Sequence, residues 1–266
     1  MLYHSVAIAQ KPLGIQLYTF RKEMPKDVPG TLQKIHQMGI KVLEGGGLYG
    51  MSADDFKELL KKNDLRIVSV GADFNELDSN IQRIVDRARL FNAGFVMCAW
   101  IPHKGTEFGI NEINKSIEVF NRAGKYLKEN GLQFCYHPHG YEFRPYKNGT
   151  LFDELVKKTN PAFVNFEMDV FWVKNGGADP VELLKKYPNR FPMFHLKDRR
   201  IGTVGNQNGT ADEETNVVLG EGDVNIKEIK QLAMKSKTTK YFFIEDESSH
   251  AMEQVPKSIA YWNSLR

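Results

Sequence analysis

The sequence alternates eight times between a short apolar run and a longer segment with helical spacing, and this alternation restricts the fold more than any other feature. The longer segments carry apolar residues every three or four positions, which is typical of helices packed on one face. Strict alternation favours a parallel sheet, and eight units favour closure into a (β/α)8 TIM barrel of the α/β class. The predicted strands are 14–20, 41–46, 66–73, 95–100, 132–139, 162–169, 191–198 and 240–246, and the predicted helices are 28–38, 53–63, 78–91, 111–130, 151–158, 180–187, 225–236 and 251–264.

An open, doubly wound sheet is the main alternative for such an alternation. It usually carries a glycine-rich phosphate-binding turn after its first strand, whereas here the first strand runs into TFRKEMP. The 266 residues suit one barrel of roughly 250 residues. We therefore expect a single domain over residues 1–266, with residues 1–11 as an N-terminal extension, ordered or flexible. The Gly-, Asn- and Thr-rich stretch 201–223 predicts a long loop.

Charge and hydropathy restrict the partners. The net charge is only +3, and no block of five or more basic residues occurs, so a nucleic-acid partner is not indicated. No apolar run approaches the roughly 20 residues that span a bilayer, so no membrane partner is expected. The N-terminus is a poor signal peptide, which favours the cytoplasm; SVAIAQ as the remnant of a trimmed signal would instead indicate the periplasm or secretion. A homo-oligomer stays open.

The two cysteines, Cys98 and Cys135, lie in apolar strand-like runs and predict buried thiols rather than a disulfide. The sequence contains no G-x-S-x-G, H-E-x-x-H or C-x-x-C motif. Chemistry is therefore sought in the arrangement of side chains that the fold brings together, rather than in a local motif.

Acidic, imidazole and ammonium side chains gather where the predicted strands end. Because a strand alternates its side chains between two faces, residues two positions apart share a face. Taken in chain order, the strand-end residues are Glu44, the pair His137 and His139, the pair Glu167 and Asp169, the pair His195 and Lys197, and Glu245 on the face of Phe243.

If these faces point inward, carboxylates and imidazoles from strands five to eight converge on one small volume. Uncompensated charges packed so closely repel one another, so a cation should lie among them. A divalent metal with mixed oxygen and nitrogen ligands fits best; carboxylate-rich ligation favours Mn²⁺ or Mg²⁺, with Co²⁺ and Zn²⁺ as alternatives.

Each residue taken singly also has a structural explanation. A strand-end acid such as Asp198 or Asp246 is often a cap in the following loop, and Glu44 fits an exposed turn. A lone strand histidine such as His195 is more often a satisfied core residue than a ligand. The joint pattern across four successive strands outweighs these separate explanations. Trp100 and Trp172, at strand ends, fit either rim packing or a platform for a sugar ring.

Seven segments together resemble one known family, the sugar phosphate isomerase/epimerases, also called xylose-isomerase-like or AP-endonuclease-2-like TIM barrels. The resemblance covers essentially the whole chain, and YHPHGYEF, FHLKD and the GEG segment are its most distinctive parts. The segments are GIQLYTFR at 14–21, GIKVLEGGG at 39–47, YHPHGYEF at 136–143, MDVFW at 168–172, FHLKDR at 194–199, LGEGDVNIKEI at 219–229 and FIEDE at 243–247.

The resemblance implies one divalent metal held by four side chains at the strand ends. Asp169, His195 and Glu245 match three of the family's ligands. The epimerases place a Glu near the end of strand five, where this chain has His137, so we expect Glu142 as the fourth ligand, with His137 as the alternative. This departure resembles the dehydratase-like and sugar-degrading branches. The AP-endonuclease branch needs further histidines and a basic face that are not evident here.

Three functions follow from the resemblance. The first is a metal-dependent isomerase or epimerase that acts on a keto-sugar through an enediolate, with Glu142 and Glu245 as acid and base and with Lys197 and His137 holding oxygens. The second is a dehydratase or lyase that expels a substituent from a 3-keto-sugar, glycoside or inosose. The third is a non-catalytic sugar-binding barrel. The expected substrate contacts are Tyr18, Glu44, Trp100, His139 and Trp172.

Overall fold

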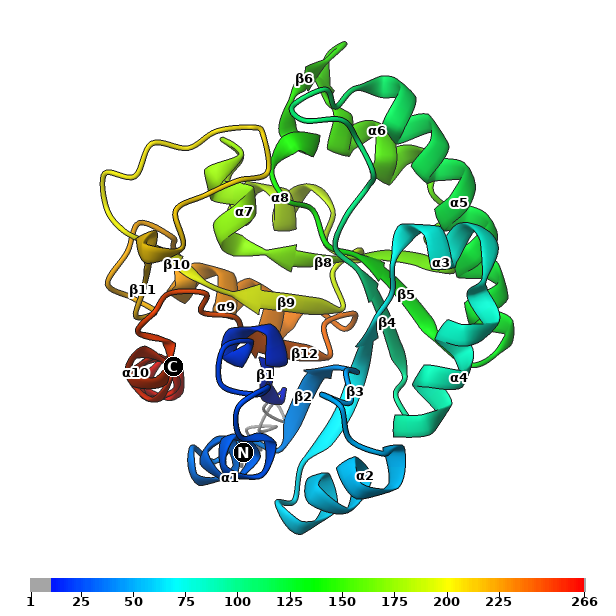
Figure 1. Cartoon of the computed structure of the whole chain (residues 1–266). Coiled ribbons are helices and arrows are strands. Elements are labelled where there is room, and N and C mark those ends of the chain that lie inside the picture. The colour runs from blue at the N-terminus through cyan, green and yellow to red at the C-terminus, as the bar shows by residue number, and fades with distance from the viewer. Residues whose placement is uncertain (1–10, 266) are drawn as a thin grey trace, which may run out of the picture.

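The structure, a computed structural model, describes residues 11–265, which form a closed barrel of eight parallel strands with helices around the outside (Figure 1). This confirms the expected fold. Around the barrel the strands follow the order β1-β12-β9-β8-β5-β4-β3-β2, so the first strand pairs with the last and no edge is left open. The barrel strands are β1 (Leu13–Gln16), β2 (Val42–Gly45), β3 (Arg66–Gly71), β4 (Phe95–Cys98), β5 (Gln133–Tyr136), β8 (Val164–Asp169), β9 (Met193–Leu196) and β12 (Tyr241–Ile244).

The helices agree with the predicted segments within one or two residues, with two exceptions. The segment predicted as one helix at 78–91 is two helices, because Asn80 adopts a non-helical backbone (φ −146°, ψ 47°) between them. A short helix that was not predicted, α7, follows β8 directly. The helices are α1 (Val28–Gln37), α2 (Ala53–Lys62), α3 (Phe74–Ser79), α4 (Ile81–Phe91), α5 (Ile110–Glu129), α6 (Leu151–Lys158), α7 (Val170–Asn175), α8 (Pro180–Lys186), α9 (Ile226–Lys235) and α10 (Ala251–Ser264).

Most of the barrel strands end two to four residues before the predicted ends. The first ends at Gln16 because the chain turns there into a 3-10 helix, Leu17–Phe20, whose first turn is capped by the Gln16 side chain. The apolar runs therefore continue past the hydrogen-bonded ladder. Their last residues form the mouth of the barrel.

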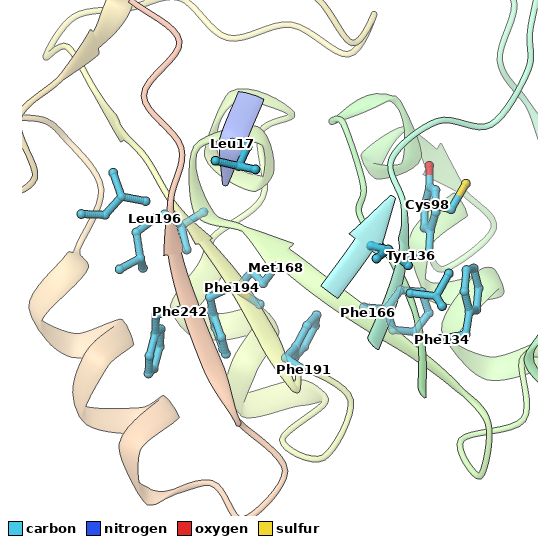
Figure 2. Packing of buried hydrophobic residues seen from close by; sticks show 14 of the residues in the cluster. Leu17, Cys98, Phe134, Tyr136, Phe166, Met168, Phe191, Phe194, Leu196 and Phe242 are labelled. Carbon is cyan, nitrogen blue, oxygen red and sulfur yellow. The ribbon is translucent and has the colours of Figure 1, made fainter. Parts of the chain in front are cut away.

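Side chains on the outer face of the strands make the main core, where they pack against the helices. Figure 2 shows this packing around Phe134, Phe166 and Phe194. The barrel interior holds a second, smaller apolar cluster that includes Cys135 and Met193. Since side chains alternate along a strand, the inward positions that follow these two residues are His137 and His195. The interior thus changes from apolar at its base to polar at its mouth.

The long connection after β9, in yellow in Figure 1, is fastened by Asp198. Its carboxylate accepts hydrogen bonds from the backbone N–H groups of Arg199, Gly220, Gly222 and Val224. The predicted loop 201–223 also contains a 3-10 turn, Glu213–Thr215, and strand β11 (Asn216–Val217), which pairs antiparallel with β10 (Asp198–Arg199). A second small hairpin joins β6 (Pro145–Tyr146) to β7 (Gly149–Thr150). Asp198 is therefore an anchor for this connection.

Other sequence expectations concern the cysteines and the membrane. Cys98 and Cys135 are both free and buried, as predicted. Across residues 11–265 the structure has no helix with the length and apolar character needed to cross a bilayer. The expected N-terminal extension lies, apart from Lys11, outside the described residues.

Candidate active site

Four buried side chains from neighbouring strand ends meet at the mouth of the barrel. They are His137 after β5, Asp169 at the end of β8, His195 in β9 and Glu245 after β12. One ligand atom from each lies within 4.8 Å of all the others. The barrel register explains part of this, since Asp169 and His195 are direct partners between β8 and β9.

The two carboxylate oxygens of Asp169 have different roles: one caps a helix and the other faces the cluster. Its Oδ1 accepts a hydrogen bond of 2.8 Å from the Trp172 N–H and so caps α7. Its Oδ2 is buried and has no hydrogen-bond partner within residues 11–265; it lies 3.5 Å from Nε2 of His137 and 3.9 Å from Nδ1 of His195. The oxygen that faces the cluster is therefore free to bind a ligand.

His137 also has unused bonding capacity. Its ring is buried, and neither ring nitrogen has a hydrogen-bond partner among the described residues. Buried polar atoms are normally paired, so an unpaired carboxylate oxygen and an unpaired imidazole facing one another fit a missing cation. Two imidazoles and two carboxylates are a donor set that suits Zn²⁺, Co²⁺ or Mn²⁺ better than Mg²⁺, which prefers oxygen ligands.

Glu142 does not lie in this cluster, so the expectation that it is the fourth ligand is not met by the geometry. It belongs to the 3-10 helix Tyr141–Phe143, and its carboxylate accepts hydrogen bonds from the Tyr136 hydroxyl and from the backbone N–H groups of His139 (3.1 Å) and Gly140 (3.0 Å). The alternative, His137, occupies the place beside Asp169. Burial raises the pKa of Glu142 to about 7 although these hydrogen bonds lower it.

This raised pKa predicts a pH-dependent stability that Glu142→Gln removes. A carboxyl with a folded-state pKa of about 7, against an ordinary value of 4.5, holds its proton more tightly when folded, so the stability that Glu142 contributes is greatest below pH 4.5 and falls as the pH rises to 7. Relative to the variant, the metal-free wild type should lose on the order of 3 kcal/mol of unfolding free energy across that window. Urea unfolding at successive pH values measures this. Parallel pH profiles for the two proteins would contradict the prediction.

Lys197 is buried among carboxylates. Its Nζ lies 2.8 Å from Oε2 of Glu245 and 3.4 Å from Oδ2 of Asp169, and it donates a hydrogen bond to Glu247. Burial alone would lower the pKa of Lys197, but the carboxylates of Asp169 and Glu245 raise it well above its usual value. In return, Lys197 and His195 hold the pKa of Glu245 well below its usual range, against the effect of burial. Lys197 lies behind the carboxylates and does not line the cavity.

A second buried layer lies beneath the four side chains. Nε2 of His195 is 2.6 Å from Oε1 of Glu44 in β2 and 3.3 Å from Oε2 of Glu167 in β8. Burial and the nearby Glu44 raise the pKa of Glu167 well above its usual value. Glu44 is completely buried and is absent from the cavity wall, so the expected substrate contact by Glu44 is not met by the geometry.

A cavity of about 830 Å³ opens in front of the cluster. Tyr18 and Trp100 stand at it with 51% and 44% of their surfaces exposed, and Trp100 is held by a stack on His103 with the ring centroids 4.6 Å apart. Burial and the neighbouring His137 lower the pKa of His139 to about 3, so His139 is neutral. The expected site residues that line the cavity are Tyr18, Trp100, His137, His139, Trp172 and Glu245.

Several residues that line the cavity were not predicted from the sequence, among them Glu247, Gln16 and Arg87. Glu247 follows Glu245 by two positions, so the alternation rule would have found it. Gln16 ends β1 and donates a hydrogen bond of 2.8 Å to Glu44. Its amide side chain is uncharged, so a search for charged residues at strand ends does not find it. Arg87 reaches the cavity wall from α4, where it pairs with Glu76 at 2.7 Å; nothing in the strand pattern indicates a helix residue there.

Comparisons with known proteins agree with this fold. A sugar phosphate isomerase/epimerase from Parabacteroides distasonis ATCC 8503 has 27% identity, with 98% of each chain covered and a TM-score of 0.78. A xylose isomerase-like TIM barrel protein from Mycobacterium smegmatis, solved in complex with magnesium, has 15% identity over 96% of each chain and a TM-score of 0.70, which shows the fold alone.

Among curated proteins, inosose dehydratase 1 of Bacillus cereus is 29% identical over 152 residues, which is 54% of this chain. The chain covers only half of that relative's length. The family description "Xylose isomerase-like TIM barrel" matches residues 32–265, nearly the whole chain. The protein therefore belongs to the xylose isomerase-like TIM barrel family.

Proposed function

We propose that this protein is a divalent-metal-dependent lyase of the dehydratase type, which removes the proton α to the carbonyl of a keto-sugar and expels the substituent on the β carbon. The observation that carries the proposal is the placement of the acids and imidazoles that line the cavity beside the cluster. Glu245 and Glu247 face the cavity after β12, while the β5 side presents His137 and His139, because Glu142 is turned away.

His137, Asp169, His195 and Glu245 are the residues that would hold the metal. A divalent ion bound there supplies positive charge beside an oxygen that becomes negative when the α-proton leaves. The ligand set of two imidazoles and two carboxylates favours Zn²⁺, Co²⁺ or Mn²⁺.

Glu245, in the cluster, and Glu247, joined to it through Lys197, both follow β12, and this placement beside the cluster suits elimination better than epimerisation. The other acids that line the cavity lie outside the cluster: Asp73, Glu76 and Glu213. Epimerisation removes a proton from one face of the carbon and returns one to the other, so it needs acid–base groups on both sides. In a syn elimination one carboxylate takes the α-proton and gives it to the leaving oxygen on the same face, so the products are an unsaturated ketone and an alcohol or water. We assign this proton transfer to Glu245 and Glu247, which Lys197 holds together.

The remaining cavity residues bind and orient the substrate. Trp100 and Tyr18 offer exposed aromatic faces, which suit the apolar faces of sugar rings. The neutral imidazole of His139 lies between Trp172 and His137 and can hold a hydroxyl. At about 830 Å³ the cavity lies in the upper part of the range of about 300–1,000 Å³ for small-molecule sites, which leaves room for the leaving substituent.

The similarity to inosose dehydratase supports elimination, and the similarity to the Parabacteroides isomerase/epimerase supports the second candidate, isomerisation or epimerisation of a keto-sugar. Both reactions begin with loss of the same α-proton.

Incubation of the Zn²⁺-, Co²⁺- or Mn²⁺-loaded protein with 3-keto-glucosides, inososes and ketohexoses in D₂O separates the candidates by NMR. We expect an unsaturated product together with the released alcohol or water, and we expect Glu245→Gln to reduce this by more than about 100-fold, since general acid–base groups contribute about 10²–10⁴. Deuterium at the α carbon without release would favour the epimerase. Neither deuterium nor release from any of these compounds would overturn both and favour a sugar-binding barrel.

A further inference from the structure

Glu44 is completely buried, yet its carboxylate touches one of the proposed metal ligands. Its Oε1 lies 2.6 Å from Nε2 of His195, across the barrel interior. The same oxygen accepts a hydrogen bond of 2.8 Å from Nε2 of Gln16, its direct register partner in β1. Glu44 does not line the cavity, so substrate contact does not account for a charged group at this depth.

A backbone group fixes the direction of the hydrogen bond between Gln16 and Glu44. The Tyr18 N–H can only donate, and it donates to Oε1 of Gln16 at 3.2 Å. The amide oxygen of Gln16 is thereby committed, so its Nε2 is the atom that faces and donates to Glu44. With Glu44 as the acceptor in this contact too, Nε2 of His195 carries a proton and donates to Glu44.

A metal-bound His195 is neutral, and a proton on Nε2 then leaves its lone pair on Nδ1. That nitrogen faces Oε2 of Glu245 at 3.1 Å and Oδ2 of Asp169 at 3.9 Å, in the four-residue cluster. A lone pair directed at two carboxylate oxygens is repulsive unless a proton or a metal cation lies between them. Carboxylates that accept the second N–H of a metal-bound histidine fix its tautomer and its orientation in many metal sites.

We propose that Glu44, oriented by Gln16, is a positioning residue that fixes the His195 tautomer so that Nδ1 faces the divalent metal. The proposal rests on the proposed function only in assuming that His195 binds a metal. It places the support for a ligand in β9 on β1 and β2, which β12 separates from β9 around the barrel.

Glu167 provides a matched control. It is as completely buried as Glu44, and its Oε2 lies 3.3 Å from the same His195 nitrogen. Unlike Glu44, it has no hydrogen-bond partner for either oxygen in the part of the chain that the structure describes. Substitution of either glutamate by methionine removes one buried carboxyl at similar volume, but only Glu44→Met removes the acceptor that orients His195.

The experiment measures Zn²⁺ affinity by competition with a chromophoric chelator for the wild type, Glu44→Met, Glu44→Gln and Glu167→Met. We expect Glu44→Met to weaken binding by about 10- to 100-fold, the usual effect of losing such a partner. Glu44→Gln keeps an acceptor oxygen and should recover most of the affinity, and Glu167→Met should stay within about threefold of the wild type, since its contact with His195 is not a hydrogen bond. The free energy of unfolding of each metal-free protein is measured in urea as a control for its stability.

Long-range ¹H–¹⁵N NMR of the histidine-labelled, Zn²⁺-loaded protein reads the tautomer directly. We expect a protonated Nε2 and a metal-bound Nδ1 for His195. The proposal would be overturned if the metal were bound to Nε2, or if Glu44→Met and Glu167→Met lost the same affinity. It would also be overturned if the wild type bound two Zn²⁺ per chain and both variants bound one. If the His195→Ala variant bound Zn²⁺ as tightly as the wild type, that result would instead overturn the proposed metal site itself.

Discussion

Replacement of Asp169 by Asn should strongly weaken divalent metal binding while the helix that follows it stays in place. The Asn oxygen can still accept from the Trp172 N–H, so α7 keeps its cap. The other position changes from the unpartnered oxygen Oδ2, which faces His137 and His195, to an amide N–H₂ group that cannot bind a metal. Because even an outer partner of a ligand costs about 10- to 100-fold, loss of this ligand should weaken Zn²⁺ binding by more than about 100-fold.

Turnover of a keto-sugar should fall with the metal content and return in part at saturating metal. Asp179→Asn is the matched control, because Asp179 caps α8 through the N–H groups of Val181 and Glu182 in the same way but lies outside the cluster. Chelator competition and the circular dichroism spectrum report metal and helix content separately. If Asp169→Asn and Asp179→Asn bound Zn²⁺ equally well, the cluster would not be the metal site.

The barrel could be predicted from the sequence because buried strands and helices each need apolar residues at a regular spacing, and short apolar runs alternate with helical spacing eight times along this chain. The same alternation placed Asp169, His195 and Glu245 on inward faces, since the two-residue period of a strand continues for a residue or two beyond its last hydrogen bond. These residues are brought together by register, which is regular in a barrel.

The destination of Glu142 could not be read from the sequence. The spacing of Glu142 after His139 is compatible with a ligand, but Gly140 adopts a φ of 101°, a left-handed conformation that glycine allows. The chain therefore turns back, and the Glu142 carboxylate lies against the N–H groups of His139 and Gly140 instead of the cluster. Such a turn depends on tertiary packing that leaves no periodic signal.

The burial of Glu44 in the barrel interior could not be predicted from the sequence either. From the sequence it is a strand-end acid before three glycines, a pattern that also fits an exposed turn. Its position depends on the stagger of the strands, which sets Glu44 beside Gln16 and one layer below the mouth. Similarly, the role of Lys197 depends on Glu247, which lies beyond the ladder of β12 and closes the carboxylate cluster around the ammonium group.

Replacement of Lys197 by Met should be among the most destabilising changes in this protein. The ammonium group is the buried cation nearest to Asp169, Glu245 and Glu247, so its removal leaves carboxylates uncompensated away from water. Breaking a buried pair in this way typically costs about 3–5 kcal/mol of unfolding free energy. Lys186→Met, which breaks a pair of 2.7 Å with Asp153 at a half-exposed lysine, should cost less than about 1 kcal/mol.

The pH dependence distinguishes this cause from lost packing. In the wild type the pKa values of Asp169 and Glu245 are held below their usual ranges, against burial, so the stability they contribute is present above the ordinary carboxyl pKa and is lost as the pH falls. Without Lys197 burial raises these pKa values, so the deficit of the metal-free variant should be largest at pH 7 to 8 and should shrink toward pH 4. Saturating Zn²⁺ should restore part of it, because a cation in the cluster faces the same oxygens. A deficit that did not change with pH or with Zn²⁺ would indicate that Lys197 contributes packing rather than charge.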